Sequence, residues 1–136
     1  MKIYQAGPLF TEADRDWHKK FTSALNQKGH TAIWPGDLFD EEHLLSLGIK
    51  AKEHIFERCM NTIDECDILV ALLDGTQVDD GTSWEIGYAF AKNIPIYGIR
   101  TDFRNGGDTS HSMVNCMIEC SCKGIAKSIS ELLELL

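Results

Sequence analysis

The sequence lacks a hydrophobic run long enough to cross a membrane. Its longest apolar segments have the length of a β-strand, whereas a spanning helix needs about 20 apolar residues. The opening segment, MKIYQAGPLF, also lacks the basic stretch, apolar core and small-residue cleavage site of a secretion signal. We therefore expect a cytoplasmic protein with no membrane partner.

Basic residues are also in short supply. The chain has 13 Lys and Arg residues against 21 Asp and Glu residues, which gives a formal net charge of -8. Nucleic acids and anionic lipid surfaces favour proteins with a basic face. We therefore expect small molecules, and not nucleic acid, as the main partners.

The five cysteines form no pattern typical of a disulfide framework or a zinc site. Their number is odd, no CxxC pair occurs, and no histidine stands at zinc-finger spacing. Cys116, Cys120 and Cys122 lie close together, which leaves a metal site as the alternative interpretation. We expect reduced thiols, no metal and no cofactor.

Apolar strand-like segments alternate with helix-like segments along the chain. Residues 67–73, DILVALL, are nearly all apolar, which is typical of a strand buried on both faces of a parallel sheet. The other predicted strands are 2–6, 31–34, 94–99 and 124–126, and the predicted helices are 11–28, 49–65, 82–92, 113–120 and 128–136, with residues 37–48 as a loop with a helical turn. This alternation predicts one α/β domain over residues 1–136, with a flavodoxin-like, doubly wound parallel sheet of five strands and helices on both faces.

Ligands of such sheets bind beyond the carboxyl ends of the strands. Three loops reach that edge here: 7–10, 74–85 and the Gly- and Asp-rich loop from Thr101 onward. Phe10 on the first loop is a candidate for stacking on a nucleobase. Arg100 and Arg104 near Asp102 are interpreted as a solvated charge cluster beside the last loop.

The second of these loops continues into DDGTSWEIGYA, residues 79–89. Thr82 and Glu85 fit a helix capping box, in which the glutamate is purely structural. Alternatively, Gly81 allows a ligand to approach the backbone closely. A carboxylate in the first turn of a helix would be kept ionised by the helix dipole. An ionised Glu85 suits a nucleophile that attacks the anomeric carbon of a sugar.

These segments together resemble the nucleoside 2-deoxyribosyltransferases. DILVALLDGTQVDDGTSWEIGYA resembles the family's buried strand, acidic loop and D-x-G-x-x-x-E-x-G-x-A segment, while IYQAGPLF, PIYGIRTDFR and NCM (115–117) resemble its other conserved segments. The likeness extends in order over nearly the whole chain. It implies transfer of a 2-deoxyribosyl group between nucleobases, or to water, in nucleotide salvage.

The resemblance also implies roles for individual residues. Glu85 would attack C1′ of a deoxynucleoside and hold the sugar as a covalent ester, and Tyr4 would orient it. Asp79, next to the Gly81 turn, would contact the sugar near its 5′-hydroxyl. The alternatives are a half-buried strand tyrosine at position 4 and a solvated loop aspartate at position 79.

Two further implied residues would come from a neighbouring subunit. Asn115 would reach the substrate and Met117 would form an apolar wall, so the resemblance implies a homo-oligomer with a shared site. Asn115 as a helix cap and Met117 as a core residue are the alternatives.

One position departs from the family pattern. Cys59 stands where the family usually has an aspartate that helps bind the nucleoside and release the base. A thiol is a poor replacement because it is a weak hydrogen-bonding group. An N-glycoside hydrolase and a non-catalytic nucleoside-binding domain therefore stay open as alternatives. Asp79 would repel a phosphate dianion, which favours nucleosides over 5′-monophosphates as substrates.

Overall fold

The fold is built on a single sheet of five parallel strands. The computed structural model describes residues 1–136. The strands are β1 (Lys2–Ala6), β2 (Thr31–Ile33), β3 (Ile68–Leu72), β4 (Ile96–Ile99) and β5 (Gly124–Ala126), in the order β2-β1-β3-β4-β5. The chain reverses its direction of winding between β1 and β3, as in flavodoxin-like folds. The predicted α/β architecture is confirmed.

The central strand β3 explains why the sheet is buried on both faces. All five of its residues are apolar and buried. Because side chains alternate along a strand, Leu69 and Ala71 enter one core cluster while Val70 and Leu72 enter the other. The nearly continuous apolar run in the sequence is therefore the signature of two cores, one on each face.

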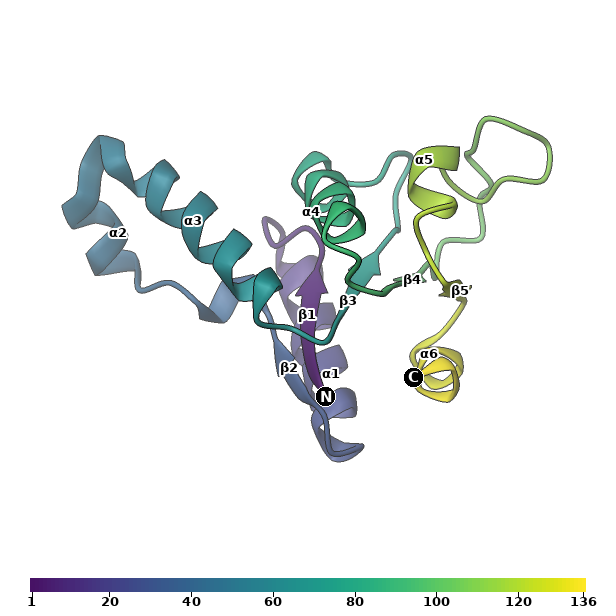
Figure 1. Ribbon diagram of the computed structural model, residues 1–136, viewed down its shortest axis with the longest axis horizontal. Coiled ribbons are helices and arrows are strands. Elements are labelled where there is room, and N and C mark those ends of the chain that lie inside the picture. Colours follow the sequence, from purple (N-terminus) through teal and green to yellow (C-terminus); the bar gives the residue numbers. More distant parts are fainter.

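Helices cover both faces of the sheet, as predicted (Figure 1). The helices are α1 (Glu12–Gln27), α2 (Glu41–Leu47), α3 (Ala51–Asp64), α4 (Asp80–Ala91), α5 (Cys116–Glu119) and α6 (Ile129–Leu135), with short 3₁₀ turns at Pro35–Asp37 and Gly48–Lys50. Phe21 of α1 and Leu132 of α6 pack in one core cluster. Ile63 of α3 and Ile86 of α4 pack in the other. None of these helices combines the length and the apolar character that a membrane span requires.

The segment between β2 and β3 differs from the sequence prediction. Residues expected to form mainly a loop form the helix α2, which is capped by the Asp40 carboxylate accepting a hydrogen bond from the His43 amide. Figure 1 shows α2 and α3 extending away from the sheet as a helical arm. Only the end of α3 nearest the sheet is buried, so Ile55 and Phe56, farther along the arm, are 37% and 49% exposed.

Candidate active site

Helix α4 begins earlier than predicted, and this decides the position of Glu85. Asp79 is the N-cap residue: its Oδ2 accepts hydrogen bonds from both the amide and the hydroxyl of Thr82, each at 2.9 Å. Asp79 is therefore not a solvated loop residue. Thr82 does not cap the helix, so the capping-box interpretation of Glu85 is wrong.

Glu85 instead reaches across to the first strand. The hydroxyl of Tyr4 donates a hydrogen bond to Glu85 Oε1 at 2.5 Å, while Oε2 has no hydrogen-bonding partner within the chain. Tyr4 is fully buried in the core rather than half-buried, so its ring is held firmly by packing. One carboxylate oxygen is thus fixed and the other is left available.

The protonation of Glu85 is governed by burial. Burial raises the pKa of Glu85 to about 7; the Tyr4 hydrogen bond acts in the opposite direction, and the nearby Asp79 carboxylate raises the pKa further. The sequence expectation of a carboxylate kept ionised by the helix dipole is wrong, because Glu85 lies beyond the first turn of α4. Near neutral pH both the acid and the carboxylate are populated.

Cys59, on α3, lies beside the same tyrosine. Its thiol interacts with the Tyr4 hydroxyl, and burial raises its pKa above the ordinary value, with a further contribution from the Glu85 charge. Burial and the neighbouring Glu85 also raise the pKa of Tyr4 far above its usual range. Both groups therefore keep their protons at physiological pH.

Gly81 leaves space next to Asp79. A Cβ atom at position 81 would come within 3.3 Å of Asp79 Oδ2, which is tighter than ordinary packing. The second carboxylate oxygen of Asp79, Oδ1, makes no hydrogen bond within the chain. Asp79 thus caps α4 with one oxygen and keeps the other free, close enough to Glu85 to influence its pKa.

None of the three remaining predicted residues forms a hydrogen bond with Glu85 or Tyr4 in this chain. Phe10 is 74% exposed, on a loop that Arg15 fastens by donating hydrogen bonds to the carbonyls of Leu9 and Phe10. Asn115 is the N-cap of α5, where its Oδ1 accepts a hydrogen bond from the Met117 amide at 3.0 Å. Met117 is 76% exposed and is not a core residue.

Asn115 and Met117 line a large cavity on the other side of α4. The cavity has a volume of about 980 Å³ and is lined by α4, by the loop after β3 and by the segment around α5. Ser83, Ile86 and Phe90 form its α4 wall. At 100° per residue, Glu85 points to the opposite side of the helix. Neither Glu85 nor Tyr4 lines this cavity.

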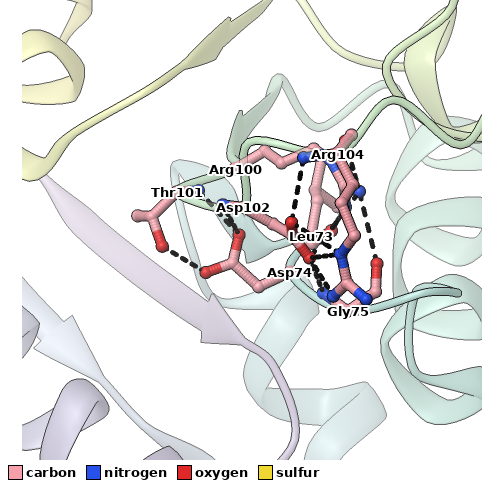
Figure 2. A network of polar contacts seen from close by, with 7 residues as sticks. All are labelled: Leu73, Asp74, Gly75, Arg100, Thr101, Asp102 and Arg104. Carbon is pink, nitrogen blue, oxygen red and sulfur yellow. Dashed lines mark hydrogen bonds and ion pairs between the residues drawn. The ribbon is translucent and has the colours of Figure 1, made fainter.

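A second polar cluster joins the loops that follow β3 and β4 (Figure 2). Arg100 is only 2% exposed, and its guanidinium donates hydrogen bonds to the carbonyls of Leu73, Gly75 and Arg104. Its interpretation as part of a solvated cluster is wrong, because these carbonyls enclose it. The Arg104 side chain is 52% exposed and pairs with Asp102.

Asp74 completes this cluster from the loop after β3. Its Oδ1 accepts hydrogen bonds from the amides of Thr101 and Asp102 at 2.6 and 2.9 Å, and its Oδ2 accepts one from the Thr101 hydroxyl. The loop after β4 is thereby anchored at its start to the loop that carries Asp79. Sequence reasoning missed this link, although an arginine directly after a buried strand was a signal for it.

Comparison with known proteins places the chain in a family. The profile of the nucleoside 2-deoxyribosyltransferases matches residues 3–117. The chain belongs to the nucleoside 2-deoxyribosyltransferase family. This confirms the resemblance that the sequence motifs indicated.

Individual relatives of this family member extend the comparison. An uncharacterized protein of Ureaplasma parvum serovar 3 is 36% identical over 116 residues, which cover 76% of this chain and 72% of that protein. The crystal structure of a conserved protein from Enterococcus faecalis V583 has a TM-score of 0.80 and 28% identity, with 98% and 95% of the two chains covered.

Two more distant structures share the fold of this family member. A 2-deoxyribosyltransferase from Bacillus psychrosaccharolyticus superposes with a TM-score of 0.81 at 23% identity, covering 97% of this chain and 90% of the other. The CMP N-glycosidase BcmB from Clostridium botulinum has a TM-score of 0.62 at 16% identity, covering 99% and 97%.

Proposed function

We propose that this protein transfers a 2-deoxyribosyl group from a nucleoside to a second nucleobase or to water, through a covalent ester on Glu85. The observation that carries the proposal is the hydrogen bond from the Tyr4 hydroxyl to Glu85 Oε1, which fixes the carboxylate and leaves Oε2 free. The pair lies where β1 and the α4 segment meet, close to the carboxyl edge of the sheet, the usual position of a ligand in this fold.

The reaction follows from this arrangement. Oε2 of ionised Glu85 attacks C1′, a C1′–O bond forms, and the C1′–N bond breaks with its electron pair passing to the base. A second base, or water, then attacks C1′ and releases the carboxylate. Tyr4 stabilises the carboxylate before attack and after release, when its charge is largest.

Asp79, Gly81 and Phe10 are proposed to bind the substrate. The free Oδ1 of Asp79 suits a hydrogen bond from a sugar hydroxyl, and the absence of a side chain at Gly81 keeps that carboxylate accessible. A 5′-phosphate would be repelled by Asp79, so free nucleosides are the favoured substrates. Exposed Phe10 is available to stack on the base.

We infer that the site is completed by a second copy of the chain. Asn115 and Met117 lie on the far side of α4 from Glu85, so they cannot serve the Glu85 of their own chain. Next to Glu85, Trp84 packs against Phe56 of the arm, and these rings remain 48% and 49% exposed. A homo-oligomer would cover this aromatic surface and bring Asn115 and Met117 of the partner subunit to Glu85.

Intact-mass analysis with a 2-fluoro-2-deoxynucleoside tests the covalent step, because the fluorine slows release of the trapped sugar. We expect one sugar adduct, mapped to Glu85 by peptide digestion. Glu85→Gln should give no adduct, and Glu57→Gln, which removes an exposed carboxylate of α3, should react like the wild type. An adduct on another residue would refute the proposed mechanism, as would the absence of any adduct with a reagent whose base is already cationic.

A separate measurement decides between transfer and hydrolysis. The protein is incubated with deoxyinosine and adenine, and the products are separated chromatographically. Deoxyadenosine and hypoxanthine indicate transfer, while free deoxyribose indicates hydrolysis. Binding without any product, both from these nucleosides and from a nucleoside whose base is already cationic, would favour a nucleoside-binding domain, the alternative that Cys59 keeps open.

A further inference from the structure

The base that leaves C1′ takes the electron pair of the C1′–N bond with it. A neutral purine or pyrimidine leaves as an anion unless it is protonated, and a positioned general acid typically contributes about 10²- to 10⁴-fold to such a step. Given the proposed nucleophile, Glu85 must itself be ionised when it attacks. The proton must therefore come from a neighbouring group.

Tyr4 is not available as that acid. Its single hydroxyl proton is already donated to Glu85 Oε1 at 2.5 Å. The side chain is completely buried, and burial together with the neighbouring carboxylate raises its pKa far above the usual range. Transfer of this proton to a base would leave a buried phenolate beside Glu85, which is unfavourable.

Asp79 is engaged as a hydrogen-bond acceptor. Its Oδ2 accepts from the amide and from the hydroxyl of Thr82 and caps α4. Its position at the helix N-terminus makes Asp79 an acceptor of hydrogen bonds and not a donor. The pKa of Glu85 is shifted by burial, by the Tyr4 hydrogen bond and by the charge of Asp79, which is the only charged group among these causes.

Cys59 is the third group beside the pair. Its thiol lies next to the Tyr4 hydroxyl and the Glu85 carboxylate, in the partly buried wall formed by α3. A thiol is a weak hydrogen-bond donor, and a buried one gives up its proton reluctantly. Glu85 and these three neighbours thus supply a nucleophile and its positioning residue but no effective acid.

We propose that Cys59 makes this enzyme selective for N-glycosides whose base is already cationic, such as 7-methyl-2′-deoxyguanosine. With such a substrate, the Glu85 Oε2–C1′ bond forms while the C1′–N bond breaks, and the released electron pair neutralises the positive ring. The base departs as a neutral molecule and no proton is transferred. This inference rests on the proposed function and specifies its substrate class.

Initial rates with 7-methyl-2′-deoxyguanosine and 2′-deoxyguanosine test the selectivity. After subtraction of spontaneous hydrolysis, we expect the wild-type kcat/KM to favour the methylated substrate by about 10² or more, the contribution that a general acid would otherwise make. Cys59→Asp should raise turnover of 2′-deoxyguanosine and shrink this preference. Cys59→Ser, the matched control, adds a hydroxyl but no acid and should leave the preference unchanged.

A series of bases on the wild-type protein gives a test that requires no variant. Without proton transfer, log kcat/KM should fall steeply as the leaving base becomes more basic. Comparable rates for the two guanosines, a shallow dependence on the base, or equal effects of the serine and aspartate substitutions would each overturn the inference.

Failure of the inference can be told apart from failure of the proposed function. The trapping reagent is prepared with 7-methylguanine as its base, so that its reaction does not need an acid. An adduct on Glu85 combined with no preference for cationic bases would refute only the role of Cys59. Absence of the Glu85 adduct with this reagent would refute the covalent mechanism itself.

Discussion

Two polar clusters lie at the same edge of the sheet, one around Glu85 and one around Arg100. In the Arg100 cluster, the guanidinium meets three backbone carbonyls, and Asp74 accepts hydrogen bonds from Thr101 and Asp102. In the Glu85 cluster, one oxygen of Glu85 and one of Asp79 have no partner within the chain. The hydrogen bonds of the Arg100 cluster are satisfied within the chain. The Glu85 cluster keeps carboxylate oxygens that only a group from outside the chain can satisfy.

This difference separates a scaffold from a site. Fully satisfied buried networks stabilise one arrangement of the loops they join. Groups left with spare hydrogen-bonding capacity and a perturbed pKa are costly for the fold and are typical of functional positions. Substitutions in the Arg100 cluster should therefore act on stability, and substitutions in the Glu85 cluster should act on activity.

The largest effect is expected from Glu85→Gln. Loss of the nucleophile should lower kcat by at least about 10³-fold, as for nucleophiles of other covalent enzymes. The folded-state pKa of Glu85, about 7, lies above the ordinary glutamate value of 4.5, so the wild type loses stability as pH rises from about 4.5 through about 7. The glutamine variant lacks this loss and should melt higher than the wild type at pH about 8. Steady-state rates and melting curves at two pH values check both expected changes. A variant that stays active, or that is destabilised, would contradict the distinction between the Glu85 and Arg100 clusters.

The effect of Arg100→Met should be nearly as large, but on stability and not on activity. Removal of the guanidinium leaves the carbonyls of Leu73, Gly75 and Arg104 without their donors, and loss of one partner of a buried charged network costs about 3–5 kcal/mol. Urea denaturation measures the change. Arg104→Met, at the exposed end of the same cluster, should cause little change. Equal losses for both variants would show that burial does not distinguish the two arginines.

Tyr4→Phe should affect activity in a pH-dependent way. The Tyr4 hydrogen bond lowers the pKa of Glu85, so its loss moves that pKa above about 7 and leaves less carboxylate at neutral pH. A hydrogen bond to a charged group contributes about 1.5–3 kcal/mol, equivalent to roughly 10- to 150-fold in rate. The rising limb of the kcat/KM profile should shift to higher pH, and activity should partly recover in alkaline buffer. A uniform loss at all pH values would mean that Tyr4 acts only through packing.

Sequence prediction and structure agree where the local residue pattern determines an element. They disagree where contacts with residues far away in the sequence determine the position of a side chain. The apolar run of β3 and the bounds of β5 follow from composition and turn residues, and both were predicted. The start of α4 was not, because Asp79 and Thr82 are both good cap residues and only the contact with Tyr4 shows where Glu85 must lie. Burial of Arg100 depends on carbonyls 25 and 27 residues away in sequence, which no local pattern indicates.

Asp79→Asn is expected to have the smallest effect on stability and separates the two functions of that residue. Asparagine is as good an N-cap as aspartate, so α4 should keep its stability to within a few tenths of a kcal/mol. The lost negative charge should lower the pKa of Glu85, because Asp79 raises it, and the kcat/KM profile should shift to lower pH. The same loss removes the repulsion of a phosphate, so relative turnover of deoxynucleoside 5′-monophosphates should rise. Asp79→Ala, which loses the cap as well, should cost about 1 kcal/mol in addition. If the asparagine variant discriminates against 5′-monophosphates as strongly as the wild type, then Asp79 serves only the helix and belongs with the scaffold around Arg100.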